Sequence, residues 1–157
     1  EGKVYPGERR EEGPFGEYTG YRASDRAPRP VVNVTAVTYR NNPILTMSCE
    51  GVPVTETHAN MCISKSAQME RELRAKGLPI AGVWFYPESA GALAVVATKV
   101  PYANVAATIA HNFFGSQAGF VAPLLIVVED DVDPHSWKEV MHALSTRCHP
   151  YRGIIRL

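Results

Sequence analysis

The sequence predicts an α/β (α+β) protein, with a loop-rich first part followed by a mixed sheet covered by helices. From residue 57 onward, amphipathic helical segments alternate with short apolar segments, an order typical of a sheet packed against helices. Residues 1–30 instead contain five of the 12 glycines and four of the 12 prolines, a density that favours turns. No internal repeat interrupts this division.

Composition limits the possible classes of protein. The 157 residues are 45% hydrophobic and 20% charged, as expected for a globular protein with a core. Sixteen basic and 16 acidic side chains cancel, which argues against nucleic-acid binding, and no apolar run approaches the ~20 residues that cross a membrane. Three widely spaced cysteines, Cys49, Cys62 and Cys148, fit neither a disulfide framework nor a zinc site, so we expect a cytoplasmic protein.

Both ends of the chain lie inside patterned sequence. Residues 3–5 resemble the end of a strand, and residues 154–157 resemble a strand that continues. We therefore expect a piece of a longer polypeptide, nicked or incomplete, whose remaining part is its first partner.

The elements of the first part follow from alternation and turn residues. Aromatic side chains recur through residues 1–30, so we expect an ordered loop there rather than a linker. Residues 31–40 are β-branched and partly alternating, and they predict a strand. A turn at residues 41–43 and a second strand at residues 44–49 would complete a hairpin.

In the second part, Thr57 can cap a helix that extends to about Lys76, with Cys62, Met69 and Leu73 on one face. Apolar strands are predicted at residues 80–86 and 92–100. Pro101 then opens a second helix, whose apolar face carries Tyr102, Ala106, Ile109 and Phe113 and which Gly115 ends.

The last elements are a strand and a helix. Residues 124–128 form a continuous apolar run, typical of a strand buried on both faces. Asp133 is predicted to cap the third helix, with Pro134 at its first position. Four apolar residues follow at i, i+3, i+4 and i+7, which predicts a buried face that consists of Trp137, Val140, Met141 and Leu144.

The strongest candidate for chemistry is the segment Glu-Gly-Pro-Phe-Gly-Glu, which begins at Glu12 and ends at Glu17. A glycine- and proline-rich loop can turn both carboxylates toward one point. Two carboxylates that share a closed site repel each other, which favours one of them keeping a proton for acid catalysis. The alternative is two solvated acids on a surface loop.

Other candidates have simpler explanations. The acids of residues 129–133 could hold a divalent cation, although a solvated strand end and a helix cap explain them better. His135 and His142 lie seven residues apart, with no acid or cysteine at ligand spacing. The adjacent pair Cys148 and His149 would point its side chains apart. The glycines of residues 115–119 follow a helix, whereas a phosphate-binding loop precedes one.

Several stretches resemble one family. Residues 12–21 read Glu-Gly-Pro-Phe-Gly-Glu-Tyr-Thr-Gly-Tyr, and residues 38–42, 56–58, 130–133 and 143–148 match further segments in the same order. On these segments the chain resembles the UbiD family of decarboxylases, which use prenylated FMN.

The resemblance implies two domains. Residues 1–56 would be the last strands of a split β-barrel that binds the flavin, together with the catalytic loop. Residues 57–157 would be most of a C-terminal α/β domain that closes over the active site and supports assembly into a homo-oligomer. Ligands for Mn²⁺ and K⁺ would lie upstream, with no metal ligand in this chain.

The resemblance also implies roles for residues. Glu17 would be the general acid that protonates the carbon losing carbon dioxide, and Glu12 would relay protons, paired with an upstream arginine. Gln117 occupies the position at which ferulate-type members place a lysine beside the cofactor. Met61 and His58 would line the substrate pocket.

The implied function is reversible, non-oxidative decarboxylation of an aromatic acid, releasing carbon dioxide. We expect a phenolic, hydroxybenzoate-like acid; a cinnamic or ferulic acid is the alternative. A rival of another class is a non-catalytic assembly domain, and a third possibility is a plain FMN-binding protein, against which the two glutamates argue. No membrane or nucleic-acid partner is expected.

Overall fold

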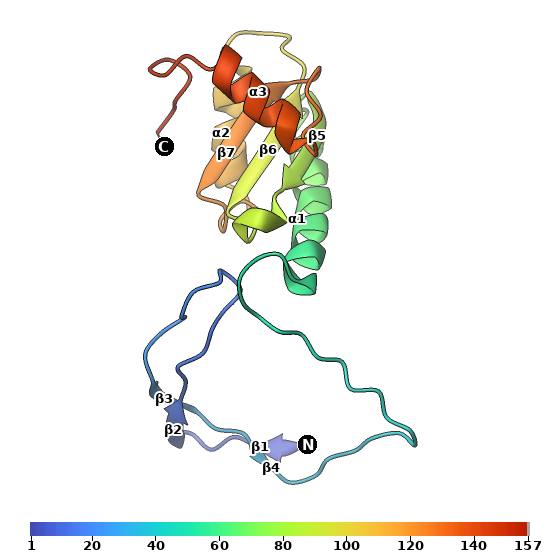
Figure 1. Ribbon diagram of the computed structural model, residues 1–157, viewed down its shortest axis with the longest axis vertical. Helices are drawn as coiled ribbons and strands as arrows, with labels where there is room; N and C mark the ends of the chain where they lie inside the picture. The colour runs from blue at the N-terminus through green and yellow to red at the C-terminus, as the bar shows by residue number, and fades with distance from the viewer. Residues whose placement is uncertain (157) are drawn as a thin grey trace.

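The computed structural model describes residues 1–156 and divides them into an extended arm and an α/β unit (Figure 1). The arm contains two small antiparallel sheets. β1 (Gly2–Lys3) pairs with β4 (Asn33–Val34), and β2 (Arg9–Glu12) pairs with β3 (Ala27–Pro30). The arm forms a wide open loop whose upper end meets the α/β unit.

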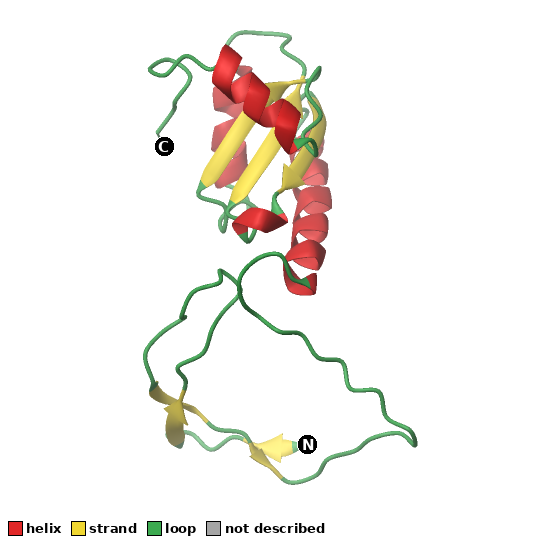
Figure 2. Ribbon diagram, viewed as in Figure 1, coloured by secondary structure: helices red, strands yellow, loops and turns green. Residues whose placement is uncertain are grey.

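The predicted hairpin of residues 31–40 and 44–49 is wrong. Within residues 31–49 only Asn33–Val34 forms a strand, and the rest is drawn as loop in Figure 2. Ile44 and Leu45 are 82% and 80% exposed, so these apolar side chains pack against no other part of the described residues. Strand propensity produces a strand only where a second strand accepts and donates the backbone hydrogen bonds.

The α/β unit carries the predicted mixed sheet. Its strand order is β5-β6-β7, with β5 antiparallel and β7 parallel to the central β6. In chain order the elements are α1 (Glu56–Ala75), β5 (Ile80–Phe85), η1 (Pro87–Ser89), β6 (Leu93–Thr98), α2 (Val105–Phe114), β7 (Leu124–Glu129) and α3 (Trp137–Arg147). The predicted α/β (α+β) class is therefore confirmed.

Helices cover both faces of this sheet, and alternation along β6 decides which side chains meet them. Ala94 and Val96 pack with residues of α1 and α2, whereas Val95 and Ala97 pack with Val140 of α3. Figure 1 shows the same three layers, with α3 in front of the sheet and α1 and α2 on its other side. The unit therefore has a separate apolar cluster on each face of the sheet.

The first two helix starts differ from the prediction. Thr55, not Thr57, is the N-cap of α1, because the imidazole of His58 accepts the backbone N–H of Thr55 in a capping box. α2 begins at Val105, not at Pro101, since Asn104 has a φ of 65° and ends the preceding turn. Tyr102 therefore lies outside α2.

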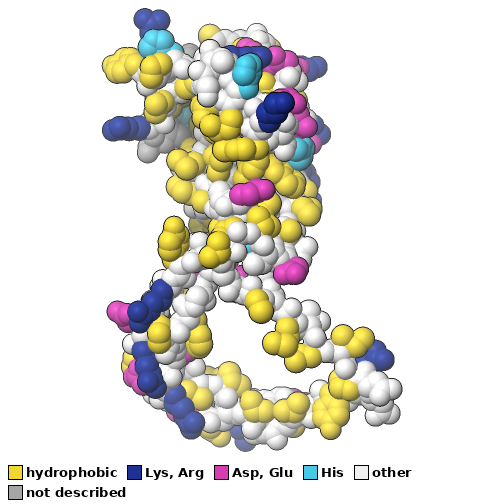
Figure 3. All heavy atoms as spheres, viewed as in Figure 1, with side chains coloured by type: hydrophobic (Ala, Val, Ile, Leu, Met, Phe, Trp, Pro, Cys, Tyr) yellow, Lys and Arg dark blue, Asp and Glu magenta, His cyan; other side chains and the backbone are white. Residues whose placement is uncertain are grey.

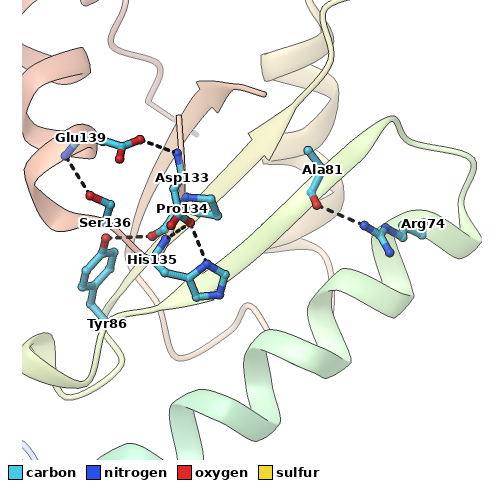
Figure 4. A network of polar contacts seen from close by, with 8 residues as sticks. All are labelled: Arg74, Ala81, Tyr86, Asp133, Pro134, His135, Ser136 and Glu139. Carbon is cyan, nitrogen blue, oxygen red and sulfur yellow. Dashed lines mark hydrogen bonds and ion pairs between the residues drawn. The ribbon is translucent and has the colours of Figure 1, made fainter. Parts of the chain in front are cut away.

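The start of α3 also differs. Ser136 is its N-cap and accepts the N–H of Glu139, whereas Asp133 accepts the N–H of His135 in a turn before the helix (Figure 4). Tyr86 donates its hydroxyl to the carbonyl of Pro134 at 2.8 Å, and burial raises the pKa of Tyr86 to about 12. This hydrogen bond holds Pro134 in the turn against Tyr86, the residue that follows β5, and α3 begins after the turn, with Ser136 as its N-cap.

The strand predicted at residues 124–128 is confirmed as β7, but its predicted burial is wrong, and the strand predicted at the end of the chain is absent from residues 154–156. β7 lies at the sheet edge; Leu124 is 60% exposed, and only Val128 of this strand is buried, so it is not buried on both faces. Residues 154–156 form no strand, since no neighbouring strand lies beside them, and residue 157 lies outside the described residues.

The predicted buried face of α3 is wrong at two of its four residues, Trp137 and Met141, of which Met141 is 36% exposed. Trp137 is 48% exposed and contacts Tyr86 edge-on at a centroid distance of 5.0 Å, whereas Val140 is fully buried. Val140 and Ala143 are the residues of α3 that pack in the apolar cluster against the sheet.

We expect Val140→Ala to destabilise the α/β unit by about 2 kcal/mol and Trp137→Ala by only about 1 kcal/mol. Two buried methyl groups are lost in the first variant, and one half-exposed aromatic contact in the second. Hydrogen exchange of the β6 backbone amides, measured in the full polypeptide, reports this free energy. A larger loss for Trp137→Ala than for Val140→Ala would contradict the structure.

Candidate active site

The two predicted carboxylates lie on one ordered hairpin, the carboxylate loop, which we define as residues 12–22. Its arms pair through the bridge of Gly16 and Arg22, and its tip is closed by hydrogen bonds from Glu17 N to Tyr21 O (3.0 Å) and from Gly20 N to Glu17 O (2.9 Å). Gly20 has a φ of 85°, which side chains disfavour and which a three-residue hairpin turn requires. Glu17 is thereby fixed at the start of the turn.

The two carboxylates have different surroundings. Glu12 ends β2, is exposed, and has its Oε2 4.0 Å from Nε of Arg29 on β3. Glu17 is half-buried and accepts the hydroxyl of Thr19. Within residues 1–156 no hydrogen bond joins the two carboxylates, so a shared proton remains a prediction.

The carboxylate loop packs against the chain that enters α1. A Cβ added at Gly20 would lie 3.0 Å from Cα of Val52 and 3.2 Å from Cδ of Pro53, so glycine allows this close approach. On the other side of the turn, Nε2 of His58 contacts the carbonyl oxygen of Tyr18. Figure 1 shows this junction where the arm meets the first turn of α1.

The structure places the other predicted site residues at different depths. His58 is completely buried, with both ring nitrogens hydrogen-bonded. Met61, one turn later, is half-buried and directs its Cε toward Gly91, 3.0 Å from the position of an added Cβ. Gln117 is exposed in the turn after α2, and no described hydrogen bond links it to the carboxylate loop. Their roles stay predictions.

The acids after β7 are paired with an arginine. Arg147 donates to both oxygens of Asp131 at 2.8 Å and to Glu129 at 3.1 Å. These hydrogen bonds hold the pKa of Asp131 below its usual range, and the backbone N–H of His135 does the same for the pKa of Asp133. In residues 1–156, no three His, Cys, Asp or Glu side chains form a cluster that could hold a metal ion.

The pair Cys148 and His149 is not arranged as a nucleophile and its base. Nδ1 of His149 accepts the backbone N–H groups of Tyr151 and Arg152, both at 3.2 Å. The Cys148 thiol instead lies 3.9 Å from the backbone oxygen of His149. The imidazole nitrogen is therefore used to close a turn.

Cys62 of α1 is fully buried, and this burial raises the pKa of its thiol to about 11. Because only the thiolate is reactive, we expect Cys62 to resist alkylation by iodoacetamide at pH 8 while the exposed Cys49 is modified, provided that the rest of the polypeptide leaves Cys49 accessible. Peptide mass spectrometry of the native protein checks this, with unfolded protein as the control. Labelling of both thiols at equal rates would contradict the burial of Cys62.

Two residues of the site were missed at the level of sequence. Thr19 contacts Glu17, and Thr55 contacts Nδ1 of His58 at 2.8 Å. The spacing of Thr55 and His58 matches a capping box, with histidine in the position that usually holds Glu or Gln. That spacing could have identified the start of α1 and the orientation of His58.

Family models match nearly the whole chain. Residues 1–53 match the Rift-related domain of 3-octaprenyl-4-hydroxybenzoate carboxy-lyase, and residues 58–157 match the C-terminal domain of the same family. The chain belongs to the UbiD family. This was the family indicated by the motifs of the sequence.

Curated relatives include decarboxylases of several aromatic acids. The chain is 37% identical to pyrrole-2-carboxylic acid decarboxylase of Pseudomonas aeruginosa, over 96% of this chain and 32% of that protein. It is 33% identical to phenolic acid decarboxylase of Bacillus subtilis, with the same coverage of 96% and 32%. The chain therefore spans about a third of the length of these relatives.

Solved structures agree with the fold. Vanillic acid decarboxylase of Sedimentibacter hydroxybenzoicus in its open form superposes with a TM-score of 0.88 and 31% identity, covering 96% of this chain and 32% of that chain. An evolved dimeric form of the UbiD-class enzyme HmfF of Pelotomaculum thermopropionicum, in complex with prFMN, gives 0.83 and 31%, covering 96% and 34%. None of the described helices is both long enough and apolar enough to span a bilayer.

Proposed function

We propose that the polypeptide containing this chain is a reversible, non-oxidative decarboxylase of aromatic acids that uses prenylated FMN. The observation that carries this proposal is the carboxylate loop, in which an ordered hairpin presents Glu17 at its turn and Glu12 at its base. Relatives that decarboxylate pyrrole-2-carboxylic and phenolic acids support it. A plain flavin-binding protein would need neither glutamate.

The chain's own contribution is proton transfer. Removal of carbon dioxide from an sp² carbon leaves an electron pair that side chains alone stabilise poorly, and the bound flavin would accept it. Glu17 would then deliver a proton to the carbon that lost the carboxylate. The hydroxyl of Thr19 donates to one oxygen of this carboxylate, and Glu12, paired with an upstream arginine, would relay protons to Glu17.

The residues described here fit only part of a cofactor site. The exposed amide of Gln117 can donate a hydrogen bond to a phosphate oxygen, which is a weaker contact than a lysine would make. No buried side-chain nitrogen or oxygen of residues 1–156 lacks a partner, so the chain offers no further orphaned donor. Upstream residues would hold most of the cofactor, with Mn²⁺ and K⁺.

The domain division belongs to the same proposal. Residues 1–56 would complete the split barrel that binds the flavin, and residues 57–157 would close over the site and support a homo-oligomer. The related vanillic acid decarboxylase has been solved in open and closed forms, which is consistent with a moving C-terminal domain. Met61 would line the substrate pocket, and a cytoplasmic location fits three free cysteines.

For the substrate we propose a phenolic, hydroxybenzoate-like acid. The phenolic acid decarboxylase relative supports this choice, while the 37% identity to the pyrrole-2-carboxylate enzyme favours a small heteroaromatic acid as a second candidate. Carbon dioxide release from 4-hydroxybenzoate, pyrrole-2-carboxylate and ferulate by the cofactor-loaded full polypeptide distinguishes them. If the polypeptide binds the cofactor but decarboxylates none of these three acids, a non-catalytic assembly role would be favoured.

We expect the isolated 157-residue chain to have no turnover, because the relay arginine and most of the cofactor site would lie upstream. The measurement is carbon dioxide release from the refolded chain after addition of prenylated FMN. The full polypeptide under identical conditions is the control. Decarboxylation by the isolated chain would contradict this division of the site.

A further inference from the structure

His58 makes hydrogen bonds in two directions from the first turn of α1. Its Nδ1 lies 2.9 Å from the backbone nitrogen of Thr55, and its Nε2 contacts the carbonyl oxygen of Tyr18. The side chain is completely buried. The imidazole therefore bridges the N-terminus of a helix and the turn of the carboxylate loop.

These two partners determine which nitrogen of His58 carries the proton. The backbone N–H of Thr55 can only donate, so Nδ1 must accept. The carbonyl of Tyr18 can only accept, so Nε2 must donate. These partners indicate a neutral imidazole protonated at Nε2, to whose Nδ1 the Thr55 hydroxyl, at 2.8 Å, can also donate. The other tautomer would lose both the bond from the Thr55 N–H and the bond to Tyr18, and the imidazolium would lose the bond from the Thr55 N–H.

This bridge has a special position in the chain. In residues 1–156, no other hydrogen bond or ion pair connects residues 1–47 with residues 55–156. The accepting carbonyl belongs to Tyr18, the residue directly after Glu17. The backbone N–H of Glu17 donates to the carbonyl oxygen of Tyr21. The Tyr18 carbonyl belongs to the peptide unit between Tyr18 and Thr19, inside the turn that the bonds Glu17 N to Tyr21 O and Gly20 N to Glu17 O close, so its position affects the turn that begins at Glu17.

We propose that His58 is a positioning residue, which donates from Nε2 to the Tyr18 carbonyl and so holds Glu17 at a fixed distance from α1. This replaces a direct contact between His58 and substrate, since both ring nitrogens are already engaged and no atom of the side chain reaches the surface. The effect on rate rests on the proposed function; the bridge itself does not.

Two variants separate the two hydrogen bonds. Asn places its amide oxygen close to the position of Nδ1, so His58→Asn keeps the acceptor for Thr55 and loses the donor for Tyr18. Gln carries its amide one bond farther out, so His58→Gln keeps a donor near Nε2. The same change at an exposed histidine of α3, His142→Asn, controls for the exchange of residue types.

In the cofactor-loaded full polypeptide we expect His58→Asn to lower kcat by about 10²-fold, the cost of a misplacement of about 1 Å, with KM changed much less. His58→Gln should recover most of that loss. A purely structural cap would give the opposite order, with His58→Asn the better variant. That order, or an equal loss in both, would overturn the proposal.

Two further measurements do not depend on catalysis. Nitrogen-15 NMR of the histidine side chains should find His58 protonated at Nε2 and not at Nδ1; the Nδ1–H tautomer would overturn the assignment. Hydrogen exchange at Glu17 N and Gly20 N should accelerate at least tenfold in His58→Asn but not in His142→Asn, and unchanged exchange would refute the bridge. If the parent protein has no turnover while these two results hold, the proposed function fails and the bridge stands.

Discussion

Glu17→Gln is expected to slow decarboxylation by the full polypeptide by about 10²–10⁴-fold, the usual cost of removing a general acid. Glutamine preserves the shape of the side chain and can still accept the hydroxyl of Thr19, so the turn of the carboxylate loop should remain folded. It cannot supply a proton. Exchange of solvent deuterium into the reacting carbon should fall by a similar factor, which links the loss to proton transfer.

Neighbouring acids of the same hairpin provide the controls. Glu11, adjacent to Glu12 on β2, pairs weakly with Arg26 at 3.9 Å and has no role in the proposed chemistry. Glu11→Gln should therefore leave the rate within about twofold, as expected for a surface substitution. Glu12→Gln should lower the rate, but by less than Glu17→Gln.

Absorbance of the bound flavin must be equal in all variants for this comparison. Near-parental deuterium exchange in a fully loaded Glu17→Gln protein would remove Glu17 from the mechanism. The carboxylate loop would then be an ordered hairpin with two solvated acids, which was the alternative from sequence.

The helices and the sheet of the α/β unit could be predicted because their apolar residues repeat with the period of the element and are buried against other elements of this same chain. Cys62, Met69 and Leu73 recur on one face of α1 and are all completely buried against the sheet. The arm has no such internal partner. Val37 and Ile44 are 75% and 82% exposed, so their apolar character could not specify a strand within these residues. Figure 3 shows apolar side chains on the surface along the open loop of the arm.

Helix starts were predicted less well, because several residues near each start can cap it. Both Thr55 and Thr57 could have capped α1, and the choice follows from the hydrogen bond between Thr55 and His58. Ser136 prevails over Asp133 because Tyr86 holds the carbonyl of Pro134. The first of these contacts is local and matches the spacing of a capping box, whereas the contact of Tyr86 with Pro134 spans 48 positions and cannot be inferred from spacing along the sequence.

The candidate site was likewise predicted only in part from the sequence. The loop that carries Glu12 and Glu17 followed from its glycines and its family motif, and its hairpin geometry agrees with a stiff loop. The contact of His58 with Tyr18 spans 40 positions in the sequence. Such a contact depends on how the arm meets α1, which local patterns do not encode.

Phe113→Ala is expected to destabilise the α/β unit by ~3–5 kcal/mol, the range for a large buried aromatic side chain. Phe113 is completely buried in the cluster between the sheet and the two helices α1 and α2. Its ring stacks on Phe85 of β5 at 5.8 Å and meets Phe114 edge-on at 5.2 Å. Alanine would leave a cavity that these fixed elements can fill only in part.

The free energy of opening is measured from hydrogen exchange of the β6 amides in the full polypeptide, since β6 is the central strand and reports on this unit alone. Phe113→Leu serves as the matched variant and should cost only about 1–2 kcal/mol, because it retains most of the apolar volume. Equal, small losses for both substitutions would mean that the cluster collapses around the missing ring. In that case α2 would not be held against the sheet by Phe113, and the packing described for this face would be wrong.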